Sequence, residues 1–106
     1  MAVPALMAAL PWQAAGAADT TENPVLMVLG DSLSAEYGLL RGEGWVALLE
    51  KRLAGDAALS RWKVVNASIS GETTAGGLAR LPQLLQQHRP ALVVIELGGN
   101  DALRGL

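Results

Sequence analysis

The segment Val25-Leu26-Met27-Val28-Leu29, followed directly by Gly30-Asp31-Ser32-Leu33-Ser34, decides the fold of this chain. Five consecutive apolar residues that end at a glycine are typical of a strand buried on both faces, as in a parallel sheet. Small polar residues directly after such a strand lie at its carboxyl end, which is where ligands bind in open α/β sheets. The rest of the chain shows whether other strands reach the same edge.

Helical and extended patterns alternate along the remaining sequence. Apolar residues at helical spacing predict a helix over 45–53, and a second helix is predicted over 73–88. Apolar and β-branched runs predict strands over 62–67 and 91–97, and a further helix is predicted to begin at Asp101. Strands that alternate with helices imply a parallel sheet with right-handed crossovers and helices on its faces.

The second predicted helix begins after a capping Thr73 or Thr74 and ends before Pro90. Its apolar stripe is predicted to consist of Leu78, Leu81, Leu84 and Leu85. Pro82 lies inside this stripe, and it predicts a kink or a later helix start.

Composition places the chain among soluble globular proteins, with 51% apolar residues, 17% charged residues and a net charge of −2. No basic patch is available for a nucleic acid or an anionic membrane. The absence of cysteine excludes thiol catalysis, thiolate metal sites and disulfide bonds. We expect a monomer that uses no cofactor and no metal.

The first 18 residues carry no charge, and residues 1–10 are apolar. The triplet Ala15-Gly16-Ala17 has the small-x-small pattern of a signal-peptide cleavage site. This predicts a signal peptide over 1–17, one mature domain over 18–106, and a periplasmic or secreted protein. No Lys or Arg precedes the apolar stretch, so an Ala-rich extension remains the alternative. The stretch is too short for a stable membrane anchor.

Each predicted strand is followed at once by small polar residues, namely 30–34, 68–73 and 98–101. In a parallel sheet these three loops leave from the same edge and can converge on one site. Glycine residues in such loops let the backbone approach a ligand and present N–H groups. A single Gly-Asp-Ser turn is more often a helix cap than a nucleophile, but three such loops in order indicate a functional site.

The three loops resemble the conserved blocks of the GDSL or SGNH hydrolases. Gly30-Asp31-Ser32-Leu33-Ser34 matches the first block, Gly71 the second, and Gly98-Gly99-Asn100-Asp101 the third. The resemblance extends from Val25 to Leu106 and is strongest to the bacterial periplasmic branch of thioesterase I, protease I or lysophospholipase L1 and arylesterases. It implies a three-layer α/β/α fold with a flavodoxin-like parallel sheet, of which this chain would be the N-terminal part.

The resemblance also implies roles for three residues. Ser32 would be the nucleophile, and its backbone N–H would form the oxyanion hole together with the N–H of Gly71 and the amide of Asn100. These residue types suit the chemistry, because fixed donors stabilise the oxyanion that forms when a serine attacks an ester or thioester carbonyl. The implied substrates are acyl-CoA thioesters, lysophospholipids or aryl esters, cleaved through an acyl-serine intermediate.

A serine nucleophile needs a base and an orienting carboxylate. The family supplies both from a late Asp-x-x-His block, which is absent from this chain. The single histidine, His88, is predicted at the far end of the second helix, away from the site. We therefore expect the 106 residues alone to be inactive. The alternative is a flavodoxin-like module that binds a phosphate or nucleotide, although the sequence has no glycine-rich phosphate fingerprint.

Other polar and aromatic residues near the three loops receive structural interpretations. Asp31 could act as a general acid, but ordering the loop is favoured for it, and Asp101 is interpreted as a cap or a brace for Asn100. Glu96 is assigned no chemistry. Trp45 and Trp62 are interpreted as core or helix–sheet contacts and not as residues that stack on a ligand. Glu72 is interpreted as an exposed loop charge that could tune substrate preference.

Overall fold

The computed structural model describes residues 22–106, so the predicted signal peptide over 1–17 lies outside the described residues. The described part contains three strands and three helices. In chain order they are β1 (Val25–Gly30), α2 (Trp45–Ala54), β2 (Lys63–Asn66), α3 (Thr74–His88), β3 (Leu92–Glu96) and α4 (Gly99–Leu103).

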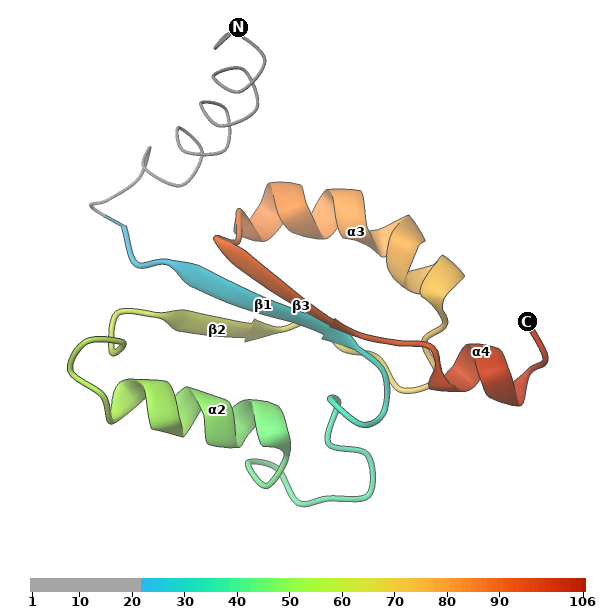
Figure 1. Cartoon of the computed structure of the whole chain (residues 1–106), viewed down its shortest axis with the longest axis horizontal. Coiled ribbons are helices and arrows are strands. Elements are labelled where there is room, and N and C mark those ends of the chain that lie inside the picture. The colour runs from blue at the N-terminus through green and yellow to red at the C-terminus, as the bar shows by residue number, and fades with distance from the viewer. Residues whose placement is uncertain (1–21) are drawn as a thin grey trace, which may run out of the picture.

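The strands form a parallel sheet in the order β2-β1-β3. Val25 pairs with Lys63 at the start of β2, and Gly30 pairs with Glu96 at the end of β3. Helix α2 lies on one face of the sheet and α3 on the other, as Figure 1 shows. The predicted α/β class, parallel sheet and three-layer arrangement are therefore confirmed.

The core is centred on β1, because among the three described strands only this one has neighbours on both sides. Met27 and Val28 are fully buried, and Leu29 is nearly so. Val46 of α2 packs with Leu26 and Val28, and Trp62 packs against this cluster. Trp62 is thus a core contact, as predicted. The residues of β2 and β3 are partly buried or exposed, and none of them is fully buried.

Helix α3 begins at Thr74, because the Thr73 hydroxyl accepts a hydrogen bond from Gly76 N at 3.2 Å. The predicted cap is confirmed. Of the two alternatives predicted for Pro82, a kink or a later helix start, the later start is wrong, since the helix runs from Thr74 to His88 with Pro82 inside it. The proline ring is exposed, so it displaces no core side chain.

The predicted leucine stripe of α3 is only partly correct, since Leu81 and Leu84 are half-buried but Leu78 and Leu85 are not. Gly77 is buried, and a Cβ at this position would lie 2.6 Å from Leu97 Cδ1. Leu78 is instead 69% exposed and Leu85 40% exposed. Helix α3 therefore approaches the sheet closely at Gly77, and apolar spacing alone did not reveal this contact.

Candidate active site at the carboxyl edge of the sheet

The loops that follow β1 and β3 lie side by side. Because Gly30 and Glu96 are paired in the sheet, the two strands end at the same level. The backbone N–H of Asp31 donates to Glu96 Oε1 at 3.3 Å. A Cβ built on Gly99 would lie 3.8 Å from Asp31 Oδ2, so the third loop approaches the first closely.

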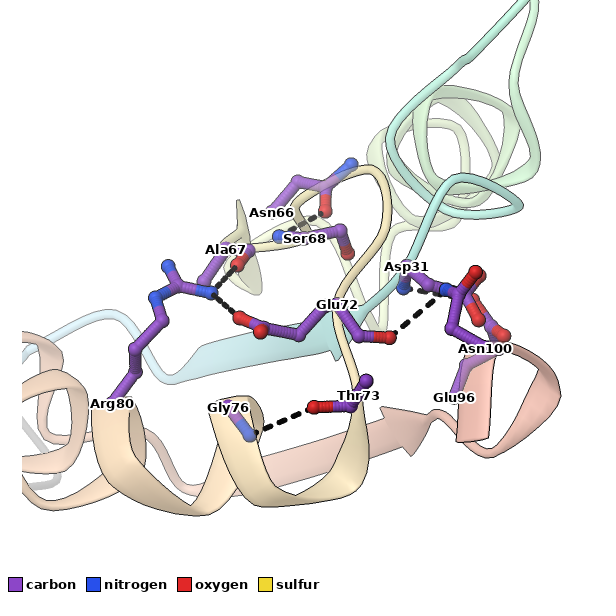
Figure 2. A network of polar contacts seen from close by, with 10 residues as sticks. All are labelled: Asp31, Asn66, Ala67, Ser68, Glu72, Thr73, Gly76, Arg80, Glu96 and Asn100. Atoms are coloured by element: carbon purple, nitrogen blue, oxygen red, sulfur yellow. Dashed lines mark hydrogen bonds and ion pairs between the residues drawn. The ribbon is translucent and has the colours of Figure 1, made fainter. Parts of the chain in front are cut away.

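The loop that follows β2 contacts both of the others. Ile69 N donates to Gly30 O at 3.0 Å, which continues the strand pairing beyond β2. The side-chain amide of Asn100 donates to Glu72 O at 2.9 Å (Figure 2). The predicted convergence of the three loops at one edge is therefore confirmed.

Ser32 lies in a tight turn that begins at Asp31. Ser34 N and Ala35 N donate to Asp31 O at 3.1 and 2.9 Å, and Leu33 N donates to Asp31 Oδ1 at 3.0 Å. The Asp31 carboxylate is almost completely buried, and it orders the turn as favoured from the sequence. Among residues 22–106, no group accepts a hydrogen bond from the backbone N–H of Ser32. That N–H is available to a ligand.

Gly71 and Asn100 contribute further donors at this edge. Gly71 has φ +86, a conformation that residues with a side chain rarely adopt. Within the described part of the chain its N–H also donates to no other group. Asn100 lies in the first turn of α4, which begins at Gly99 and not at Asp101 as predicted. The bond to Glu72 O uses one amide hydrogen of Asn100 and leaves the second amide hydrogen for a ligand.

A partly buried polar network supports the turn that carries Ser32. The Ser34 hydroxyl donates to Glu96 Oε1 at 2.7 Å and accepts from Trp45 Nε1 at 2.9 Å. Asn66 Nδ2 donates to Ser34 O at 2.7 Å. A Cβ on Gly30 would lie 2.7 Å from Ser34 Oγ and 2.8 Å from Glu96 Oε1, so only glycine fits.

Sequence reasoning missed this network. Glu96 received no chemical role, and Trp45 was expected to make a core or helix–sheet contact. The Trp45 side chain instead bonds Ser34 through its indole N–H and remains 38% exposed. One signal was available in the sequence: Glu96 is an acidic residue in the otherwise apolar run of β3, at the edge where the loops meet.

The second loop is held by an ion pair (Figure 2). Arg80 Nη1 lies 3.1 Å from Glu72 Oε2 and donates to Ala67 O at 3.0 Å. The Glu72 side chain is only 12% exposed. The expectation of an exposed loop charge was therefore wrong, because Arg80 on α3 draws this carboxylate inward.

Asp101 links the third loop to the start of α3. Thr74 N donates to Asp101 Oδ1 at 2.9 Å, and the Thr74 hydroxyl donates to Asp101 Oδ2 at 2.6 Å. Asp101 is thus a brace between loops, as predicted. These two hydrogen bonds, that from the Thr74 hydroxyl foremost, lower the pKa of the Asp101 carboxyl below its ordinary value.

This lowered pKa predicts an acid-dependent contribution to stability. A carboxyl whose pKa is lower in the folded state stabilises the fold fully above its unfolded pKa of about 4, and the contribution is lost as pH falls through the folded pKa. Between pH 6 and pH 3, the urea concentration at the midpoint of unfolding is expected to fall less in Asp101→Asn than in the wild type. Equal falls in both proteins would contradict this prediction.

His88 lies far from the three loops. It ends α3, and just beyond it Ala91 N donates to Val25 O at the amino end of β1, the opposite edge of the sheet. This position is as predicted. Within residues 22–106, no cluster of three histidine or acidic side chains is arranged to bind a metal. No helix in the same range has the length and hydropathy needed to span a membrane.

Comparison with known proteins agrees with this arrangement. A relative from Pseudomonas aeruginosa named esterase TesA is 65% identical over 81 residues, which is 76% of this chain and 39% of that protein. The thioesterase 1/protease 1/lysophospholipase L1 of Escherichia coli (strain K12) is 55% identical over 91 residues, which is 86% of this chain and 39% of that protein. This chain therefore spans 39% of the length of each relative.

A crystal structure of TesA superposes with a TM-score of 0.71 at 64% identity, covering 77% of this chain and 44% of that chain. The model of the GDSL-like lipase/acylhydrolase family matches residues 28–106, a range that contains all three loops. The chain belongs to the GDSL-like lipase/acylhydrolase family.

Proposed function

We propose that the complete protein carrying this chain is a serine hydrolase that cleaves carboxylic esters or thioesters. Ser32 Oγ attacks the carbonyl carbon, and the alcohol or thiol leaves with a proton. Water then hydrolyses the acyl-serine, which releases the acid and regenerates Ser32. One observation carries this proposal: the N–H groups of Ser32 and Gly71, which have no partner among residues 22–106, lie at the same edge as the amide of Asn100.

These three donors suit the tetrahedral oxyanion of acyl transfer. Donors that are fixed before the reaction stabilise the developing charge without reorganisation, and each contributes about 10²–10³ in rate. The tether from Asn100 to Glu72 O supports this role, because it holds the amide against the loop that contains Gly71.

The general base and its carboxylate partner are proposed to lie C-terminal to Leu106, in the Asp-x-x-His block that the family resemblance implies. The length of the relatives supports this, since 39% of each is covered here. His88 is at the opposite edge of the sheet and is not part of the proposed triad.

The proposed substrates are small acyl esters and thioesters with an apolar acyl group, including acyl-CoA thioesters, lysophospholipids and aryl esters. The names of the two relatives, an esterase and a thioesterase/lysophospholipase, support this range. Three exposed apolar side chains lie in the segment that follows Ser32: Leu33 is 72% exposed, Tyr37 76% and Leu40 74%. They offer apolar surface to an acyl chain. We further propose a monomer located in the periplasm or secreted, with residues 1–17 removed.

The test compares the complete protein with the 106-residue chain on a p-nitrophenyl ester. We expect turnover by the complete protein and little or none by the 106 residues alone, because the single histidine, His88, lies at the opposite edge of the sheet from Ser32. The readout is p-nitrophenolate release at equal molar concentration. Robust turnover by the shorter chain that disappears in its Ser32→Ala variant would overturn the assignment of the base to later sequence.

A further inference from the structure

The carboxylate of Glu96 holds both ends of the turn that contains Ser32. One oxygen, Oε1, accepts from Asp31 N at 3.3 Å and from Ser34 Oγ at 2.7 Å. Ser32 therefore lies between two residues that bond to the same atom. Glu96 itself is fixed, because it ends β3 in register with Gly30 of β1. The position of the turn is thus set by the rigid sheet.

The hydrogen bonds of this network can be donated in only one direction. An indole N–H can only donate, so the Ser34 hydroxyl accepts from Trp45 and must give its own hydrogen to Glu96. A carboxylate accepts both available donors, and hydrogen bonds to a charged acceptor are stronger than neutral ones. The Ser34 side chain is 1% exposed, so water does not compete for these bonds.

We propose that Glu96 is a positioning residue for the hydrolase reaction, acting through the turn on the hydroxyl and the backbone N–H of Ser32. The inference rests on the function proposed above. Among the described residues, the Glu96 carboxylate bonds Asp31 and Ser34 and not Ser32, so it acts on the nucleophile through the turn. It fixes the nucleophile and one oxyanion donor relative to Gly71 and Asn100, and this relative placement is what the transition state requires.

The expected effect is on kcat more than on KM. A misplacement of about 1 Å at a reacting group costs about 10² in rate, whereas substrate binding depends on surfaces that Glu96 does not contact. We expect Glu96→Ala to lower kcat about 100-fold with KM within about threefold. Glu96→Gln keeps an oxygen acceptor of the same shape and is expected to restore kcat to within about tenfold of the wild type.

The experiment uses the complete protein and counts reactive sites by burst titration with a fluorophosphonate before kcat is calculated per site. Val46→Ala is the matched control, because it removes buried volume from the core beneath α2 and its side chain makes none of the hydrogen bonds of the network. Unfolding midpoints are measured for every variant. We expect Val46→Ala to lose stability while keeping kcat per titrated site.

The outcomes separate this inference from the proposed function. If Glu96→Ala retains wild-type kcat per titrated site, or if Glu96→Gln is as impaired as Glu96→Ala, the positioning role is overturned. If wild type neither turns over ester nor reacts with the fluorophosphonate at Ser32, the proposed function fails instead. The inference is supported if kcat per titrated site falls in Glu96→Ala, recovers in Glu96→Gln and stays at the wild-type value in Val46→Ala.

Discussion

Replacing Ser32 with alanine is expected to lower kcat/KM of the complete protein for a p-nitrophenyl ester by about 10⁴-fold or more. The proposed acyl-serine intermediate cannot form without the hydroxyl, and removal of a serine nucleophile leaves only the catalysis contributed by the oxyanion hole and by binding. Ser32 is half-buried in an ordered turn and its side chain supports no other group in the described residues. The fold of the variant should therefore be unchanged.

Ser70→Ala provides the matched control, since Ser70 is an exposed serine in the neighbouring loop. A fluorophosphonate probe should label wild type and Ser70→Ala and should not label Ser32→Ala. Retention of labelling in Ser32→Ala would place the nucleophile elsewhere. If wild type is not labelled but binds a nucleotide tightly, the phosphate-binding alternative would replace the hydrolase proposal.

The fold was predictable because its decisive features are local. The apolar run over 25–29 requires burial on both faces, and only a central strand between two parallel neighbours provides it. Once the strands are parallel, topology alone brings the three following loops to one edge. The placement of Ser32, Gly71 and Asn100 at that edge follows from the order of elements and needs no knowledge of side-chain packing.

The supporting polar groups were not predictable in the same way. Serine and glutamate are usually exposed, so nothing local shows that Ser34 is buried or that Glu96 reaches it across 62 residues of sequence. Glu72 was misjudged for the same reason, because its partner Arg80 lies on α3, two turns beyond the loop. Such contacts depend on how helices and strands pack, and periodicity does not encode that.

Replacing Asn100 with alanine is expected to lower kcat/KM about 10²–10³-fold, with the loss mainly in kcat. The proposed role of the amide is to donate to the oxyanion, which develops in the transition state and the tetrahedral intermediate but is absent from the bound ester, so ground-state binding should change little. Asn100→Asp should be at least as impaired, because a carboxylate cannot donate and would place a negative charge beside the developing oxyanion. Steady-state kinetics on a p-nitrophenyl ester measure both effects.

Asn100 also tethers the second loop through Glu72 O, so loss of the tether must be separated from loss of the donor. Arg104→Ala makes this separation, because Arg104 Nη2 donates to Gly71 O at 3.3 Å and belongs to the same short segment as Asn100. That variant removes a bond to the loop without removing an oxyanion donor, and it is expected to keep kcat/KM within about threefold of the wild type.

If Arg104→Ala loses as much activity as Asn100→Ala, loop position and not charge stabilisation explains the effect of Asn100. If Asn100→Ala loses less than tenfold, its amide does not contribute to the oxyanion hole, and the donors must be sought among Ser32, Gly71 and groups beyond Leu106.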